Sequence, residues 1–444
     1  MKKTIISLSL AIMLLAACTP QKDARQTSFK LPATDDIAMY QVNPRVFAPS
    51  KSLNAVTARI DSIQALGVNM LWVMPIYPIG EEKTKNSPYC IRDYKAIAPE
   101  FGTLDDFKKL TQTCHEHGMG IIMDWVANHT AWDNPWVKEH KDWYTHDQKG
   151  EIIHPAGTDW TDVADLNYNN RDMRNAMIDA MLFWIRDMGV DGFRCDYADG
   201  VPADFWKEAI DTLRKAAGDR QIIMLAEGKR VDNFTVGGFQ MNYGWDYKDS
   251  LVSVFCKGRS VEHLFAADKA EYDSLPQGRV KMRFTTNHDH ASEISPVKQF
   301  TNERGSMAAY VATIFPHGGA LIYGSQEVGY EDNINFFKYV PVNWMAHGDL
   351  YKEYQHLIKL YNDNTALRKG KMTPYPDKDI MLFEKKDDAG AFLVAINVRN
   401  EAHSMALPDA WKDMVALDVY SGKDYTLKDK IELKPFEYII LKTK

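Results

Sequence analysis

The chain has 444 residues, of which 45% are hydrophobic and 25% charged, and its formal net charge is −7. This composition is typical of a globular protein with one large core and a smaller second one, and it carries no signature of disorder. The charge is spread without blocks. Because binding of nucleic acid would need a basic stripe, we do not expect a nucleic-acid partner.

The N-terminus differs from the rest of the chain. Two lysines precede an apolar run from Thr4 to Ala17 that is too short to span a bilayer, which indicates a signal peptide. The run ends in Leu-Ala-Ala-Cys at 15–18, which resembles the bacterial lipobox. This resemblance implies a lipid on Cys18 that anchors the protein, and Thr19 favours the outer membrane. Residues 19–34 are expected to form a flexible tether. An ordinary cleavage site with an incidental cysteine is the alternative.

Four cysteines remain after Cys18, namely Cys90, Cys114, Cys195 and Cys256. An even number in an exported chain permits disulfides, but their spacings form no disulfide framework and no Cys/His metal motif. We therefore expect free, packed thiols.

From about residue 36 short apolar runs alternate with amphipathic segments. Eight runs are predicted as strands, at 37–42, 70–75, 120–124, 190–196, 222–226, 239–242, 283–286 and 319–323. Amphipathic helices are predicted after Asn54 (with apolar positions Val56, Ile60, Ile63 and Leu66), at 103–117, at 173–188, from 202, at 302–315 and at 351–362. This alternation predicts an α/β fold, a (β/α)8 TIM barrel over 35–369.

Two other regions depart from this rhythm. About forty residues, roughly 129–169, show no period and are predicted to form a short domain B inserted after the third strand. Its tryptophans, Trp132, Trp136, Trp143 and Trp160, are expected either to pack its small core or to stack on sugars. Residues 370–444 alternate strands with turns, which predicts a C-terminal antiparallel β-sandwich domain.

Charged side chains cluster at the predicted C-terminal ends of strands, where barrel enzymes carry their chemistry. Arg194 and Asp196 are two residues apart, so they share one face of a strand, and the guanidinium is expected to keep the carboxylate ionised. Glu227 ends the next strand and Asp289 follows the seventh. Two carboxylates that flank a sugar are the apparatus of glycoside hydrolysis. An unrelated barrel enzyme would need a metal or phosphate site, and the sequence has no glycine-rich phosphate loop.

Seven segments resemble, in order, conserved regions of the α-amylase family, glycoside hydrolase family 13. They are Ser87–Tyr94 with Phe101–Thr103, Asp124–His129, Asp165–Asn167, Gly192–Asp196, Ala226–Gly228, Phe284–Asp289 and Tyr323–Glu327. The resemblance covers the chain from about residue 36 to its end and implies a retaining hydrolase of α-1,4-glucosidic bonds in starch, maltodextrin or related oligosaccharides.

The resemblance also implies a role for each matching residue. Asp196 is the nucleophile, Glu227 the acid/base and Asp289 the stabiliser of the transition state. Tyr89 stacks on the sugar that is cleaved, while His129, Arg194 and His288 bind the sugar or orient Asp196. Asn128 is the position where relatives bind a structural calcium, together with oxygens of domain B and a carbonyl near Gly200.

Two departures from the family pattern concern the subsites for the leaving sugar. Gly200, preceded by Asp199, stands where amylases carry histidine, and Lys229 stands where they carry an aromatic residue or histidine. Endo-acting specificity is therefore open, and an exo-acting α-glucosidase or a glucanotransferase is the alternative. A non-catalytic glucan-binding lipoprotein is less favoured, because all three carboxylates are present.

Overall fold

The computed structural model describes residues 29–273 and 275–444. The predicted signal peptide, the lipobox with Cys18 and the first part of the tether lie outside the described residues. In the remainder of the predicted tether, residues 29–34, two side chains contact the folded domain. Leu31 is buried under the barrel, and the ring of Phe29 stacks on His115 with centroids 4.6 Å apart.

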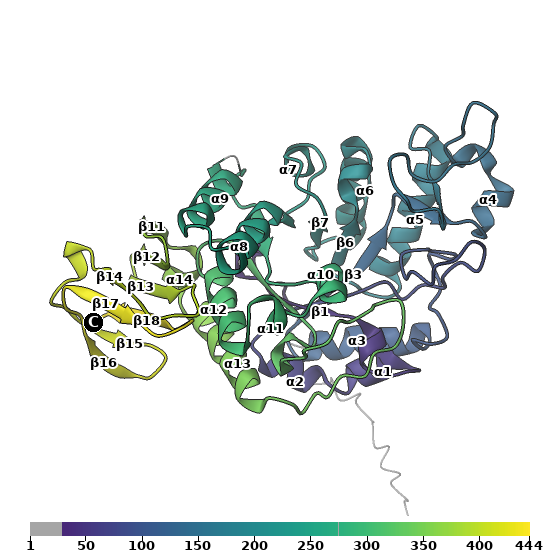
Figure 1. The fold of residues 1–444 in the computed structure, drawn as a ribbon. Helices are drawn as coiled ribbons and strands as arrows, with labels where there is room; N and C mark the ends of the chain where they lie inside the picture. Colours follow the sequence, from purple (N-terminus) through teal and green to yellow (C-terminus); the bar gives the residue numbers. More distant parts are fainter. Residues whose placement is uncertain (1–28, 274) are drawn as a thin grey trace, which may run out of the picture.

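Eight parallel strands form a closed barrel in the order β1-β10-β9-β8-β7-β6-β3-β2, as predicted (Figure 1). They are β1 (Ala38–Val42), β2 (Met70–Val73), β3 (Gly120–Val126), β6 (Gly192–Asp196), β7 (Ile223–Ala226), β8 (Met241–Tyr243), β9 (Val280–Arg283) and β10 (Gly319–Tyr323). Alternate residues face alternate sides. In β1, Met39 packs inside the barrel, whereas Ala38, Tyr40 and Val42 pack against the surrounding helices.

Helices surround the barrel. They are α1 (Ser52–Thr57), α2 (Ile60–Ala65), α3 (Leu104–Glu116), α5 (Arg171–Arg186), α6 (Ala203–Ala217), α7 (Asp232–Thr235), α8 (Trp245–Lys257), α9 (Glu262–Asp273), α10 (His288–Glu293), α11 (Pro296–Gln299), α12 (Glu303–Ile314), α13 (Gly348–Asp363) and α14 (Thr365–Lys369). Thr103 caps α3 in a reciprocal capping box with Asp106, as its sequence indicates. Among the helices that the structure describes, none has both the length and the apolar character that a membrane crossing requires.

Two local predictions are wrong. Asn54 does not cap a helix: it lies inside α1, which starts after Lys51, and its amide donates a hydrogen bond of 3.0 Å to Asp106. The seventh strand, β9, ends at Arg283 instead of running through 284–286. The chain leaves the sheet there because Asn287 caps α10, accepting a hydrogen bond from the backbone of His290.

The insertion after β3 forms a small substructure with its own two-stranded sheet. Its elements are β4 (His129–Ala131), α4 (Pro135–Glu139), the 3-10 helix η3 (Lys141–Trp143) and β5 (Val163–Asp165), and β4 pairs antiparallel with β5. Trp136 stacks on Tyr94 and contacts Trp143, which is buried, so these tryptophans pack a core. Trp160, in contrast, lines the large cavity described below.

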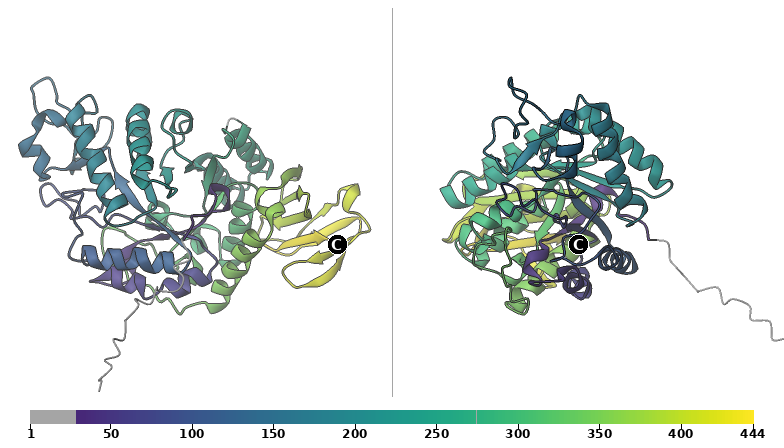
Figure 2. Two further views of the ribbon diagram at one scale, coloured as in Figure 1. Left: turned by 180° about the vertical axis from the view of Figure 1, so that it is seen from behind. Right: turned by 90° about the vertical axis from the view of Figure 1, so that its right-hand side faces the viewer.

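The C-terminal region forms two packed antiparallel sheets. The larger has the order β11-β12-β13-β18-β15-β16 and the smaller pairs β14 with β17. Their bounds are β11 (Lys371–Tyr375), β12 (Ile380–Asp387), β13 (Gly390–Asn397), β14 (His403–Ala406), β15 (Val415–Asp418), β16 (Lys423–Thr426), β17 (Lys430–Leu433) and β18 (Tyr438–Thr443). Figures 1 and 2 show this region and the insertion on opposite sides of the barrel, so they do not meet.

The four described cysteines are free thiols, and the prediction that they are packed is correct for three of them and wrong for Cys256. Cys90, Cys114 and Cys195 are buried and Cys256 is exposed. Cys195 packs in the cluster between barrel and helices, on the side of β6 opposite to Arg194 and Asp196.

Candidate active site

A cavity of about 710 Å³ opens at the C-terminal ends of the barrel strands. Its lining includes Tyr89, His129, Asp196, Glu227, His288 and Asp289, which are six of the residues that the sequence indicated. Aromatic side chains form much of the rest of the wall: Trp160, Tyr197, Trp245, Phe336 and Phe337. The volume and this mixture of aromatic and carboxylate groups suit a sugar chain.

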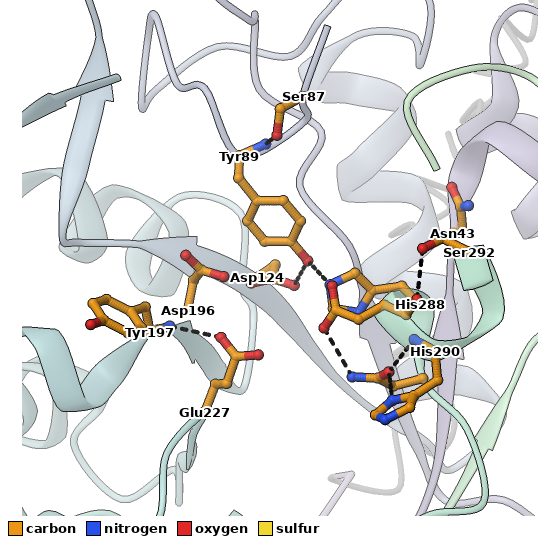
Figure 3. Close-up of polar contacts among 12 residues, drawn as sticks. Asn43, Ser87, Tyr89, Asp124, Asp196, Tyr197, Glu227, His288, His290 and Ser292 are labelled. Atoms are coloured by element: carbon orange, nitrogen blue, oxygen red, sulfur yellow. Dashed lines mark hydrogen bonds and ion pairs between the residues drawn. The ribbon is translucent and has the colours of Figure 1, made fainter. Parts of the chain in front are cut away.

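Arg194 is the centre of the site and is completely buried. Its Nη1 lies 2.7 Å from Asp124 Oδ1 and 2.9 Å from Asp196 Oδ1, and its Nη2 lies 2.7 Å from Glu227 Oε1. Asp196 and Glu227 therefore share one guanidinium, and Figure 3 shows the two side chains near each other, with the Glu227 carboxyl group joined to the backbone of Tyr197.

One guanidinium does not neutralise three buried carboxylates. Burial, together with Glu227, raises the pKa of Asp196 well above its ordinary value, although Arg194 acts in the opposite direction. Burial likewise raises the pKa of Asp124 to about 6. Arg194 thus favours the ionised form of Asp196, as predicted from the sequence, while burial and the Glu227 carboxylate favour the protonated form.

Glu227 is held by the backbone that follows the nucleophile. The Tyr197 N–H donates a hydrogen bond of 2.8 Å to Glu227 Oε2 (Figure 3), and the Ala198 N–H donates one of 2.9 Å to the Glu227 carbonyl. Tyr197 adopts a left-handed conformation with φ of 42°, which is uncommon for a residue other than glycine. This turn after Asp196 aims the amide at the carboxylate of the neighbouring strand.

Tyr89 and His288 line another part of the cavity, and the buried Gln41 supports His288 from behind. The Tyr89 hydroxyl lies 2.7 Å from His288 Nε2 and 3.1 Å from Asp124 Oδ2 (Figure 3), while Gln41 Nε2 lies 2.9 Å from His288 Nδ1. Burial lowers the pKa of His288 to about 3, so the imidazole is neutral. Asp289 receives a hydrogen bond of 3.2 Å from Asn287, burial raises its pKa, and its side chain is 46% exposed and lines the cavity.

His129 and Asn128 lie together at the base of the insertion. Burial lowers the pKa of His129 to about 4. Asn128 Oδ1 faces Gly200, where an added Cβ would lie 2.7 Å from it, and Asn128 Nδ2 lies 3.3 Å from His129 Nδ1. Within 29–273 and 275–444 no three His, Cys, Asp or Glu side chains are grouped to hold a metal. A calcium ion here would rely on amide and carbonyl oxygens, and it stays a prediction.

Sequence reasoning missed several members of the site. Asp124 was read only as part of a motif, yet it pairs with Arg194 because β3 and β6 set these two residues opposite each other. Gln41 and Phe336 gave no signal, since one follows a strand pattern and the other lies in a long irregular segment. Asp199 and Lys229 were noted as departures, and both line the cavity.

Comparisons with known proteins agree with this geometry. The family model described as alpha amylase, catalytic domain, matches residues 41–369. The alpha-amylase MalA of Haloarcula japonica is 27% identical over 321 residues, 69% of this chain, but the match spans only 46% of that relative. Alpha-amylase 2 of Dictyoglomus thermophilum is 25% identical over 394 residues, covering 84% of this chain and 68% of the relative.

A solved structure also agrees with the chain in length. The maltogenic alpha-amylase AmyB of Thermotoga neapolitana superposes with a TM-score of 0.83 at 26% identity, covering 93% of this chain and 99% of that one. The whole described architecture, C-terminal sheets included, thus has a counterpart of nearly the same extent.

Proposed function

Because the chain belongs to the α-amylase family, we propose that it is a retaining glycoside hydrolase of α-1,4-linked glucose polymers or oligomers. One observation supports this proposal most directly: Arg194 pairs with the carboxylates of both Asp196 and Glu227, and both line one cavity of about 710 Å³. The two relatives and the solved structure named above are amylases, which supports the same substrate class.

The reaction proceeds in two displacements. In the first, Asp196 attacks the anomeric carbon while Glu227 gives its proton to the departing sugar oxygen, so that the C–O bond breaks as the ester bond to Asp196 forms. In the second, Glu227 takes a proton from water, water attacks the same carbon, and Asp196 leaves. Asp289 and the neutral His288 hold hydroxyls of the distorted ring, and Arg194 balances the charge that moves between the two carboxyls.

Proton NMR of maltoheptaose hydrolysis tests the reaction class. The account predicts that the α-anomer of the new reducing end appears first and later equilibrates with the β-anomer. First appearance of the β-anomer would mean inversion and would contradict the double displacement. Absence of cleavage, with glucan binding intact, would favour the non-catalytic alternative.

An exo-acting enzyme is the second candidate, and the wall beside Tyr89 favours it. Phe336 meets Tyr89 and His288 edge-on, with ring centroids 6.2 and 5.1 Å away. Arg45 donates a hydrogen bond of 3.1 Å to the Phe336 carbonyl, and Asn86 donates one to the Phe337 carbonyl. These bonds hold Phe336 and Phe337, which line the cavity, and we propose that the two residues limit how far the substrate extends past Tyr89. The similarity to a maltogenic amylase is consistent with short products.

Product analysis separates the two candidates. Exo action on maltoheptaose releases one short product from the start, internal cleavage releases a mixture of oligomers, and transfer creates chains longer than the substrate. If Arg45→Ala leaves the product distribution unchanged, the segment of Phe336 and Phe337 does not determine which products are released.

The proposal includes the lipid anchor at Cys18 and an outer-membrane location, which rest on the sequence at 15–19. We expect Cys18→Ser to move the protein out of the outer-membrane fraction, and an unchanged distribution would contradict the anchor. It also includes calcium at Asn128, for which chelation should lower the Tm. An unchanged Tm after dialysis against EDTA would remove calcium from the account.

A further inference from the structure

We infer that Asp199 is a positioning residue for the acid/base Glu227. It holds the backbone segment that follows Glu227 in place. The inference rests on the proposed function, because it assigns a role within the same reaction. Asp199 precedes Gly200, and its carboxylate contacts Lys229; Gly200 and Lys229 are the two positions where the sequence departs from the amylase pattern.

The Asp199 carboxylate is bound almost entirely by the loop after β7. Its Oδ2 accepts hydrogen bonds from the backbone N–H of Lys229 at 2.9 Å and of Arg230 at 3.4 Å. Its Oδ1 accepts one of 2.8 Å from Nδ2 of Asn233, a side chain with no exposed surface. Both oxygens of the carboxylate are thus engaged by donors that follow Glu227 in the chain, although Asp199 also lines the cavity.

Arg230 completes the connection in the opposite direction. Its Nη1 donates to the Asp199 carbonyl at 2.8 Å and its Nη2 to the Val201 carbonyl at 3.1 Å. The loop after β6, which carries the nucleophile, and the loop after β7, which carries the acid/base, are therefore linked by side chains from both. Such a reciprocal link restrains both loops more than a single hydrogen bond does.

Gly228, the residue after Glu227, makes the contact between Asp199 and this loop possible. A Cβ on Gly228 would lie 2.0 Å from Asp199 Oδ1, so only glycine allows the carboxylate to approach the backbone this closely. Glu227 is thus held at both ends. The Tyr197 amide fixes its carboxylate, and Asp199 fixes the two residues that come after Gly228.

A leaving-group experiment tests this role. Departure of a sugar needs a proton from Glu227, whereas departure of fluoride does not, and kcat/KM reports only the first displacement. We expect Asp199→Ala to lower kcat/KM on maltoheptaose by about 10- to 100-fold, within the range of general acid catalysis, and on α-maltosyl fluoride by less than about 3-fold. Equal losses on both substrates, or no loss on maltoheptaose, would overturn the inference.

Asp232→Asn is the matched control. Asp232 also pairs with Arg230, at 3.1 Å from Nε, but no hydrogen bond joins it to the backbone of Lys229 or Arg230. Both substrates should be cleaved by this variant as by the wild type; a selective loss on maltoheptaose would assign the effect to Arg230 instead of Asp199. Wild-type enzyme that cleaves neither substrate would overturn the proposed function and this inference with it.

Two further variants keep the test decisive if Asp199→Ala folds poorly. Asp199→Asn preserves the shape and one acceptor oxygen, so it should show the same selectivity with a smaller loss. Gly228→Ala should impair maltoheptaose cleavage in the wild type, and it should add little once Asp199 is alanine, because the clash has gone. Additive losses would contradict a direct contact between the two positions.

Discussion

Nη2 of Arg194 lies 2.7 Å from Oε1 of Glu227. The arginine on the fourth barrel strand is therefore paired with the acid/base residue that follows the fifth strand. The same guanidinium holds Asp124, whose side chain is also fully buried. Removing this charge would leave carboxylates buried without a partner, which is among the most costly changes a core can undergo.

Arg194→Ala is therefore expected to lower the free energy of unfolding by about 3–5 kcal/mol as well as to abolish activity. Denaturant titration measures the loss. Arg92→Ala is the control, since Arg92 forms an exposed pair with Glu81, and it should change stability by at most about 1 kcal/mol. Equal stability of the two variants would show that the buried cluster needs no arginine to fold.

Tyr89→Phe separates the hydroxyl of this residue from its ring. The variant loses the hydrogen bonds to His288 and Asp124 but keeps the stacking surface, so kcat/KM should fall by about tenfold, the equivalent of one hydrogen bond of about 1.4 kcal/mol. Tyr351→Phe is the control, because it also removes a hydrogen-bonded hydroxyl, which donates to the Ser62 carbonyl. Tyr351 does not line the cavity, so this variant should leave kcat/KM unchanged. Similar kcat/KM values for Tyr89→Phe and the wild type would mean that the ring alone matters.

His129 makes stability depend on pH. Its pKa falls from 6.5 in the unfolded chain to about 4 in the folded one, so the unfolded state binds the extra proton between these values. The contribution is present above pH 6.5 and is lost as the pH falls toward 4. Relative to His129→Gln, the wild type should lose about 2 kcal/mol of unfolding free energy between pH 6.5 and pH 5. Parallel pH curves for the two proteins would contradict a buried neutral imidazole.

Lys385 is a second titrating group, where the C-terminal sheets meet the barrel. It is completely buried, donates to the Pro316 carbonyl, and burial lowers its pKa from 10.5 to about 7. The unfolded state binds more protons between these values, so stability should rise from pH 7 toward pH 10. Lys385→Met should flatten this rise, by up to about 1.4 kcal/mol per pH unit, when unfolding is measured by denaturant. An unchanged slope would assign the pH dependence to other groups.

The sequence predicted the parts of the site that lie on regular strands. Arg194 and Asp196 share a face because a strand alternates with period two, and Glu227 lies at a strand end because an apolar run stops there. What it did not predict depends on how strands are aligned with each other. Asp124 faces Arg194, and Glu227 reaches the same guanidinium, only because barrel closure sets the registers of β3, β6 and β7.

The irregular segments explain the other errors. Asparagine is a favoured helix cap, but the Asn54 side chain donates instead to Asp106 of α3, and α1 already starts at Ser52. Phe336 and the Asp199 contacts belong to loops whose conformation is set by long-range hydrogen bonds, such as that of Arg45 with the Phe336 carbonyl. No local pattern encodes such pairings.

Mass spectrometry of a trapped intermediate tests the central claim most directly. An α-glucosyl fluoride with a second fluorine on the ring forms the covalent intermediate faster than water removes it, so the sugar stays on the nucleophile. The account predicts one added sugar on the peptide that contains Asp196, and none in Asp196→Ala. A sugar found on Glu227, or hydrolysis with no labelled peptide and with inverted products, would contradict the assignment of Asp196 as nucleophile.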